Sequence, residues 1–348
     1  MSTEAARRVT MTDVAEQAGV SIATVSRALS GTRPMSPEIR AHVQQTAERL
    51  GYQVNLVGRA LRRRRSSTVG LIVPDLDNPF FSSLAQHLSR TFEPSAIDLL
   101  VFSADSNLRT ERRGVQSFIG RQVDALVLIP CHETESEASI TAACEAVVTI
   151  QLDRQVPATG AHFVGCDNRR GMALVAAHIA RDVDIESQPV VYVGATPGPS
   201  SGHERLSAFQ EAFGRCPTLL GSFDAGWGQT AAEQLLDQGT MSGTVVAAAD
   251  VIALGVLSRL HSLGFRVPED FRVIGFDGIG VSHLAQPTLT TVRQPVEEIS
   301  QVILDLVTQG LTEGQRRGER EMIEIEPELV IGESSPASPS AAAQSVHD

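Results

Sequence analysis

The chain has 348 residues, a formal net charge of −12 and a mean hydropathy near zero. Its length exceeds one ordinary domain, and the lack of a long apolar run excludes a signal peptide and a membrane span, so we expect a cytoplasmic protein. The cysteines form no CxxC pair and the histidines show no metal-ligand spacing, which predicts reduced thiols, no metal site and no cofactor. The sequence contains no nucleophile elbow, Walker motif or dinucleotide motif, so we do not expect an enzyme.

The first predicted helix runs from Met11 to Ala18. Its apolar residues recur at helical spacing, at Met11, Val14, Ala15 and Ala18. Thr10 is placed to cap its start, Asp13 follows three residues later, and Gly19 can end the helix in the left-handed conformation. The helix and the segment after it, through Leu29, have the layout of a helix-turn-helix.

A second helix should begin at Ser21, an N-cap residue, and bury Val25 and Leu29. Its outward surface would then consist of Ile22, Ala23, Ser26 and Arg27. A third helix is capped by Ser36 and ends at Gly51. Its predicted inner stripe consists of Ile39, Val43, Ala47 and Leu50. Three helices in about fifty residues form a small head.

The distribution of charge favours nucleic acid as the partner of this head. Residues 1–65 carry eleven Arg against five acidic residues, a net charge of +6, so the other 283 residues carry −18. A basic end on an acidic chain directs that end toward phosphate. The alternative is a plain helical bundle, because short helix pairs of this kind also occur in proteins that never bind DNA.

The segment from Val9 through Arg27 resembles the LacI/GalR family of bacterial transcription regulators. The resemblance implies that the second helix enters the major groove, with Ile22, Ala23 and Arg27 reading bases. It also implies that Ser21 and Thr24 lie near phosphates and that Thr12 contacts DNA. Arg27 should dominate direct readout, because a guanidinium can donate two hydrogen bonds to a guanine edge.

The next segment, Asn55 to Arg62, matches the hinge helix of the family. The resemblance implies DNA contacts by Asn55, Leu61 and Arg62, with Leu61 wedged into the minor groove at the centre of a two-fold operator. Such a short helix containing Gly58 should fold only on DNA. The alternative for Arg62 to Arg65 is a solvated, Arg-rich linker.

From Thr68 onward, apolar runs alternate with amphipathic stretches, which predicts an α/β fold with parallel sheets covered on both faces. The runs are Val69–Val73, Leu99–Phe102, Ala125–Ile129, Ala146–Ile150, Val190–Val193, Thr244–Ala247 and Val273–Phe276. The length favours two subdomains. The resemblance agrees and implies a periplasmic-binding-protein-like core whose chain crosses between the subdomains three times.

We place the crossings near His162–Gly165, Thr290–Gln294 and Met322–Glu324. The expected organisation is then a DNA-binding head (1–54), a hinge helix and linker (55–67), a core (68–332) and a disordered tail (333–348). Within the core, the N subdomain covers about 68–164 and 294–321, and the C subdomain covers about 165–293 and 322–332.

Ligands of such sheets bind beyond the carboxyl ends of the strands. The expected effector contacts there, which match the family's pattern, are Asp75, Asn78, Phe80, Asp153, Arg205, Trp227, Asp250, Asp277 and Gln294. Asp153 is followed by Arg154 as in the family, whereas Asp167 and Asn168 are expected to cap a helix. Ala249 stands where the family commonly has Asn, so an amide that reads hydroxyls is missing.

The expected function is a regulator, most simply a repressor, that binds a pseudo-palindromic operator as a homodimer. Its effector would be a sugar or sugar derivative, with a sugar acid, a sugar phosphate or a nucleoside as alternatives. Because fold alone does not fix function, a binding protein or an enzyme of the same fold is the competing hypothesis. The sequence leaves the effector's identity and the sign of its effect open.

Overall fold

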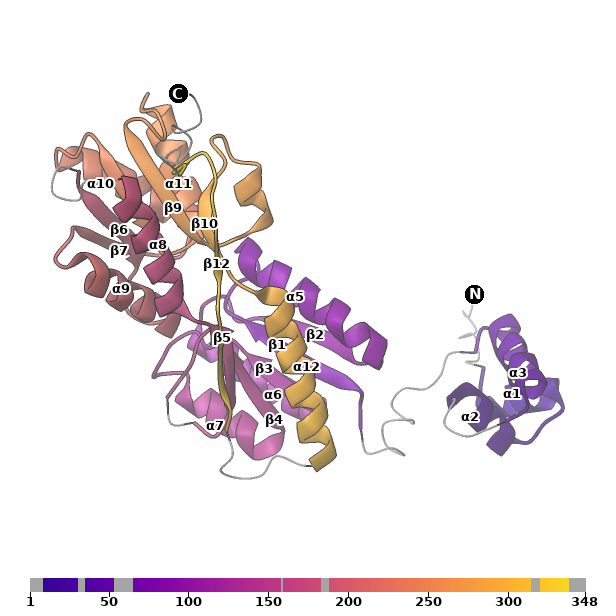
Figure 1. Cartoon of the computed structure of the whole chain (residues 1–348). Coiled ribbons are helices and arrows are strands. Elements are labelled where there is room, and N and C mark those ends of the chain that lie inside the picture. Colours follow the sequence, from indigo (N-terminus) through magenta and orange to yellow (C-terminus); the bar gives the residue numbers. More distant parts are fainter. Residues whose placement is uncertain are drawn as a thin grey trace, which may run out of the picture. The chain divides into compact units, whose positions relative to one another are not determined.

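The computed structural model describes residues 9–30, 35–52, 65–157, 159–182, 188–313 and 320–337. These residues fall into two compact units, residues 1–66 and residues 67–348 (Figure 1). The first unit contains the head, and the second contains the α/β core. Each unit is described by itself below.

The head consists of three helices, α1 (Met11–Ala18), α2 (Ile22–Ser30) and α3 (Pro37–Leu50). Thr10 and Asp13 form the expected capping box, in which the Asp13 carboxylate accepts from the Thr10 amide at 2.7 Å. Gly19 ends α1 with a φ of 63°, a value that favours glycine. The three helices pack around an apolar centre formed by Val14, Ala15, Ala18, Val25, Ala28, Val43 and Ala47.

The expected inner stripe of α3 is wrong at Ile39, which is 43% exposed. The face that packs begins one turn later and consists of Val43, Thr46 and Ala47. Buried positions are mostly apolar, but an apolar residue is not always buried, and many single apolar side chains remain at the surface.

The first lobe of the core is built on a six-stranded sheet with the order β11-β5-β4-β3-β1-β2. Its strands are β1 (Thr68–Val73), β2 (Asp98–Ser103), β3 (Ala125–Leu128), β4 (Val148–Leu152), β5 (His162–Cys166) and β11 (Met322–Ile325). Its helices are α5 (Pro79–Phe92), α6 (Leu108–Gly120), α7 (Glu137–Ala146) and α12 (Val296–Glu313). A short 3-10 helix, η1 (Glu93–Ser95), follows α5. All strand pairs of this sheet are parallel, and apolar clusters pack around it.

The second lobe repeats this plan, with the order β12-β10-β9-β8-β6-β7. Its strands are β6 (Val190–Ala195), β7 (Thr218–Gly221), β8 (Gly243–Ala247), β9 (Phe271–Asp277), β10 (Thr290–Arg293) and β12 (Glu328–Val330). Its helices are α8 (Asn168–Asp182), α9 (Ser200–Phe213), α10 (Ala225–Asp237), α11 (Asp250–Ser262) and the 3-10 helix η2 (Gly280–His283). Only β12 runs antiparallel to its neighbour among the described strands.

The chain passes between the lobes after β5, after β10 and between β11 and β12, as Figure 1 shows. The expected assignment of residues 322–325 to the C subdomain is therefore wrong, because β11 pairs with β5 in the first sheet. The last crossing lies at Glu326–Pro327. The strand-like pattern of residues 322–325 gives no local sign of a crossing, and the first residue that interrupts it is Pro327.

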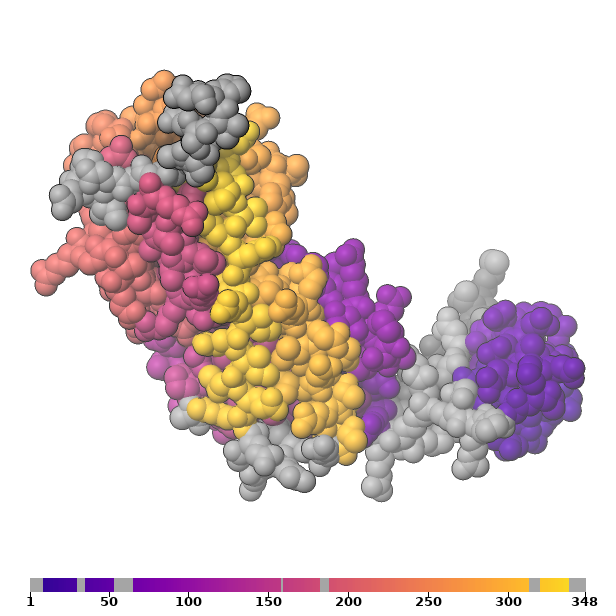
Figure 2. All heavy atoms as spheres, in the orientation of Figure 1, coloured from indigo at the N-terminus to yellow at the C-terminus, as the bar shows by residue number. Residues whose placement is uncertain are grey.

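The segment after β12 is also better ordered than expected. Ser334 and Ser335 are fully buried in the second lobe. The Ser334 hydroxyl donates to the carbonyl of Val273 at 2.6 Å, and the Ser335 carbonyl lies 2.9 Å from His178 Nε2. A disordered tail beginning at residue 333 is therefore wrong for residues 333–335. In Figure 2 the yellow segment runs along both lobes of the core.

Candidate functional site

The outward face of α2 presents the residues expected to read DNA. Ile22 is 49% exposed, and Ala23 and Arg27 are also exposed. Val25 and Ala28 are buried on the opposite face and anchor α2 to the head. A helix held by its apolar face while a short row of side chains faces outward has the form of a groove-reading helix.

Hydroxyl groups gather at the N-terminus of α2. Ser21 Oγ accepts from the amide of Thr24 at 3.1 Å and lies 2.9 Å from Thr24 Oγ1. Ser21 therefore caps the helix, as expected. Thr12 is exposed at the start of α1. Amides and hydroxyls at a helix N-terminus suit contact with phosphate.

The three hinge residues of the expected DNA surface, Asn55, Leu61 and Arg62, lie outside the described residues. Their contribution therefore stays a prediction. The described part of the expected DNA surface consists of Thr12, Ser21, Ile22, Ala23, Thr24 and Arg27.

Arg205 on α9 is the centre of a buried polar cluster in the core. Its side chain is almost fully buried, and its guanidinium lies 3.7 Å from the ring centroid of Phe276. Its Nε donates to Asn168 Oδ1 at 2.8 Å, and its Nη1 donates to the Ala248 carbonyl at 2.7 Å and to Asp277 Oδ1 at 3.1 Å. A buried guanidinium with this many acceptors is held in one position.

Two carboxylates, one from each lobe, face Arg205. Asp277 ends β9 in the second lobe, whereas Asp153 follows β4 in the first lobe, with its Oδ1 3.9 Å from Arg205 Nη2. Both have a positive φ, 121° for Asp277 and 61° for Asp153. Such backbone conformations are uncommon for residues with a Cβ and gather at functional sites. Arg205 thus links the two lobes electrostatically.

Burial dominates the protonation of this cluster. It raises the pKa of Asp277 to about 7, although Arg205 lowers it. Burial also acts to lower the pKa of Arg205, but Asp277 and Asp153 together raise it, so Arg205 stays charged. Near neutral pH the site therefore has a permanent cation and a carboxyl group that can gain or lose a proton.

Gln294 completes the polar floor beside Asp277. Its Nε2 donates to Asp277 Oδ1 at 2.9 Å, whereas its buried Oε1 has no hydrogen-bond partner among the described residues. Both residues, together with Phe80 of α5, line a cavity of about 810 Å³. A buried acceptor without a partner is typical of a place where a ligand or a water completes the network.

Asp250 is close by but is used to hold the fold. It accepts from the Ile279 amide at 2.9 Å, from Ser282 Oγ at 2.7 Å and from Thr291 Oγ1 at 2.5 Å. Burial raises its pKa to about 6 against these hydrogen bonds. A Cβ at Gly275 would lie 2.2 Å from Asp250 Oδ1, so the strand passes directly against this carboxylate. Its geometry is that of a clamp between α11, η2 and β10.

Trp227 packs against the interior of the second lobe. Its Nε1 donates to the Gly194 carbonyl at 2.9 Å, and its ring lies directly over Gly221. The indole is therefore committed to β6 and β7. It is a half-buried residue that packs against the core of the second lobe.

The loop after β1 is shaped by its own side chains. Asp75 Oδ1 accepts from the Asp77 amide at 2.8 Å, and Asn78 Oδ1 accepts from the Phe80 amide at 3.0 Å as the cap of α5. Phe80 is buried and meets Phe81 edge to face at 5.4 Å. Of this loop's three candidates, Phe80 is the one that lines the cavity.

The cluster also contains residues that were not among the nine expected effector contacts. Asn168 was expected to be a cap, but it accepts from Arg205 and donates to Glu204 at 2.7 Å. The others are Arg154 and three aromatic residues. The rings of Phe81 and Phe223 lie against the guanidinium of Arg154, and the ring of Phe276 lies against that of Arg205. Their position directly after a strand or near a strand end was the available signal for Arg154 and Phe276.

The lobes also touch at the rim of this site. The Glu133 amide donates to the Gly198 carbonyl at 2.7 Å, and the Gln155 amide donates to Ser200 Oγ at 2.9 Å. Each of these bonds joins the first lobe to the second. A change in the angle between the lobes must therefore break or remake them.

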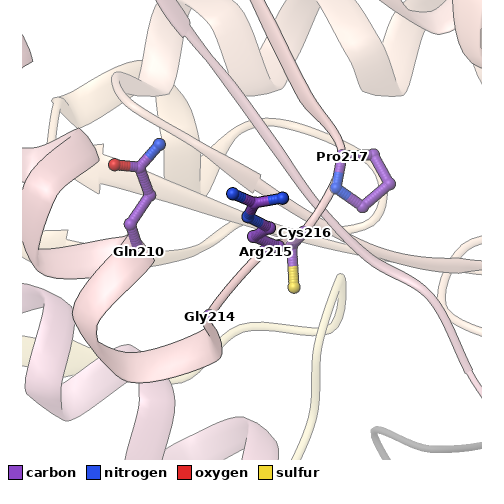
Figure 3. Close-up of a pocket in the computed structure, with 5 residues that line it drawn as sticks. All are labelled: Gln210, Gly214, Arg215, Cys216 and Pro217. Carbon is purple, nitrogen blue, oxygen red and sulfur yellow. The ribbon is translucent and has the colours of Figure 1, made fainter.

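A second pocket lies away from this cluster (Figure 3). It is lined by Gln210, Gly214, Arg215, Cys216 and Pro217. These residues follow α9 and precede β7, at the amino edge of the second sheet, where α/β folds rarely bind ligands.

Other chemistries find no support in the part of the chain that the structure describes. No group of three or more His, Cys, Asp or Glu side chains could hold a metal ion there. The four cysteines are free thiols, and burial raises the pKa of Cys131 to about 12. None of the described helices is both long and apolar enough to cross a bilayer.

Two family models match the chain. Residues 10–55 match bacterial regulatory proteins of the lacI family, and residues 188–335 match a periplasmic binding protein-like domain. The chain is 30% identical over 304 residues to the HTH-type transcriptional regulator AscG of Escherichia coli K12, covering 85% of this chain and 90% of that one. It is 32% identical over 340 residues to the HTH-type transcriptional repressor CytR of the same organism, covering 95% and 97%.

The chain belongs to the LacI family. Solved structures of the fold agree, including the lac repressor dimer bound to operator and an anti-inducer. That match has a TM-score of 0.81 at 24% identity and covers 95% of this chain and all of that one. The expectation of a helix-turn-helix head followed by a two-subdomain α/β core is thereby confirmed. This LacI-family member is accordingly a DNA-binding regulator of transcription and not an enzyme.

Proposed function

We propose that this protein is a repressor that binds a pseudo-palindromic operator as a homodimer and responds to a sugar or sugar derivative. The effector would bind beside Arg205, between the two lobes. The observation that carries the proposal is the position of Arg205, which faces Asp277 of its own lobe and Asp153 of the other. A ligand inserted here changes contacts in both lobes at once.

The chemistry of the cluster suits a polyhydroxylated ligand. Each hydroxyl group can both donate and accept, and the site offers carboxylates, a guanidinium and the unpartnered Gln294 Oε1. Phe80 and Phe276 supply flat apolar surface nearby. Aromatic rings with a few convergent polar groups are typical of small-molecule sites.

Exposed apolar residues support the homodimer. Strand β2 forms an edge of the first sheet, and its Leu100 and Val101 are 38% and 41% exposed. In the second lobe Val281 and Leu284 of the η2 region are 43% and 80% exposed. Uncovered apolar side chains beside an open strand edge favour a partner copy.

The proposed control follows from linkage between these parts. If the effector binds one lobe arrangement better than another, it shifts the dimer toward that arrangement. The separation of the two hinges then changes, and the affinity for the operator changes with it. We expect the effector to lower the affinity for the operator, so that its binding releases the repressor from DNA.

The test is a selection of random duplex DNA on the purified full chain, first without ligand and then with a panel of sugars, sugar acids, sugar phosphates and nucleosides. Recovery of a two-fold symmetric site that a panel member changes would support the proposal. Ligand binding without any sequence preference for DNA would refute the repressor assignment.

A further inference from the structure

A second buried arginine, Arg154, has fewer hydrogen-bond partners than Arg205. It follows Asp153 after β4 and is 6% exposed. Its guanidinium lies over the rings of Phe81 in the first lobe and Phe223 in the second, 5.3 and 5.6 Å from their centroids. Arg154 is thus at the boundary between the lobes, as Arg205 is.

The hydrogen bonding of Arg154 is incomplete. Among the described residues, its one hydrogen bond joins Nη1 to the Pro130 carbonyl at 3.5 Å, the outer limit of such a bond. Its buried Nε has no hydrogen-bond partner there, and Asp153 Oδ2 is 3.8 Å away. Buried charges are normally both paired and hydrogen-bonded, because desolvation without compensation is costly. Burial accordingly lowers the pKa of Arg154.

The charges around Arg154 leave a positive excess. Asp153 is shared, since its oxygens lie 3.8 Å from Arg154 and 3.9 Å from Arg205. Asp277 is already bonded to Arg205, and its pKa of about 7 leaves it partly neutral at physiological pH. Two guanidiniums therefore share less than two negative charges.

We propose that the effector carries a carboxylate or phosphate group and that Arg154 binds this group through its Nε and Nη donors. The planar fork of a guanidinium matches the two oxygens that either group presents. This inference rests on the proposed effector site and names the chemical class of its ligand. It also gives Arg154 a role that Arg205, with its acceptors already in place, does not need to fill.

The test compares matched ligands on the full-length protein by calorimetry. The pairs are ribose 5-phosphate with ribose and gluconate with glucose, and inorganic phosphate serves as a minimal probe. The Arg154→Met substitution removes the charge and keeps an unbranched apolar side chain over the rings of Phe81 and Phe223. Arg113→Met is the matched control, because Arg113 is exposed and lies 5.8 Å from the centroid of Phe102, outside the cluster.

We expect at least one anionic probe to bind more tightly than its neutral counterpart, and Arg154→Met to weaken that binding about 10- to 100-fold, as for a charge-assisted hydrogen bond. The Arg113→Met variant should bind like the parent. The melting temperature of Arg154→Met without ligand should not fall, because an unsatisfied buried charge is removed.

Three results would overturn this inference. The first is that no anionic probe binds in an Arg154-dependent manner. The second is a large drop in melting temperature for Arg154→Met, which would make Arg154 structural. The third is release of the operator by a neutral sugar equally from the parent and from Arg154→Met, which would refute the anionic effector but leave the proposed repressor function intact.

Discussion

In the head, the candidate DNA contacts are exposed side chains on one short helix and the residues beside it. In the core, the candidate effector contacts are buried and come from α8, α9, β9 and the segments after β4 and β10. Exposed side chains such as Arg27 contribute little to the fold, whereas Arg205 supports both lobes. Substitution of a recognition residue should therefore change binding alone in the head, but both binding and stability in the core.

The largest effect should come from Arg205→Met. Its loss leaves Asp277 buried without its cation, a change that typically destabilises by about 3–5 kcal/mol. Urea unfolding followed by the fluorescence of Trp227, the chain's single tryptophan, measures it. The companion variant is Arg154→Met, which should unfold like the parent. Equal destabilisation of both variants would remove the distinction between the two buried arginines.

The second effect concerns pH. Because burial raises the pKa of Asp277 from 3.8 to about 7, the folded state holds this proton more tightly than the unfolded state. Its stabilising contribution is complete below about pH 4 and is lost as the pH rises toward 7, by at most about 4 kcal/mol. Asp277→Asn cannot ionise, so its unfolding free energy relative to the parent should rise from pH 4.5 to pH 7.5. A constant difference would contradict the raised pKa.

In the head, Arg27→Ala should cost about 1–3 kcal/mol of binding at one base position of each half-site and leave unfolding unchanged. Arg49→Ala is the matched control, since Arg49 is an exposed arginine in the last turn of α3. Competition binding with single-base operator variants measures the effect. Equal weakening for all sequences would instead make Arg27 a phosphate contact.

The smallest effect should come from Trp227→Phe. This change removes the hydrogen bond from Nε1 to Gly194 and should destabilise the core by about 0.5–1.5 kcal/mol, as measured by circular dichroism. Effector affinity should not change, because the ring packs over Gly221. A large loss of affinity with unchanged stability would show that Trp227 contacts the ligand.

The sequence was most informative where local rules decide the structure. The Thr10–Asp13 capping box and the turn at Gly19 follow from residues a few positions apart, and both are present. The apolar runs likewise predicted seven strands of the two sheets. Five strands, β5, β7, β10, β11 and β12, were not among these runs. Strand β7, for example, is neither long nor fully buried.

Long-range features were less accessible. The placement of β11 depends on its pairing with β5, about 160 residues earlier, and no local signal distinguishes the two lobes for Met322–Ile325. Similarly, the sequence marks Asp153, Arg205 and Asp277 as strand-end or helix residues but does not reveal which of them share a proton or a cation. The incomplete bonding of Arg154 is visible only once its neighbours are in place.

The two strands on either side of Pro327 have a consequence for biosynthesis. Strand β11 adds to the first sheet and β12 to the second, and both are made after every other strand of the core. Neither lobe can therefore finish its sheet while the earlier part of the chain is emerging from the ribosome. The contacts of the head all lie within its own short segment, so the head can fold before the core is complete.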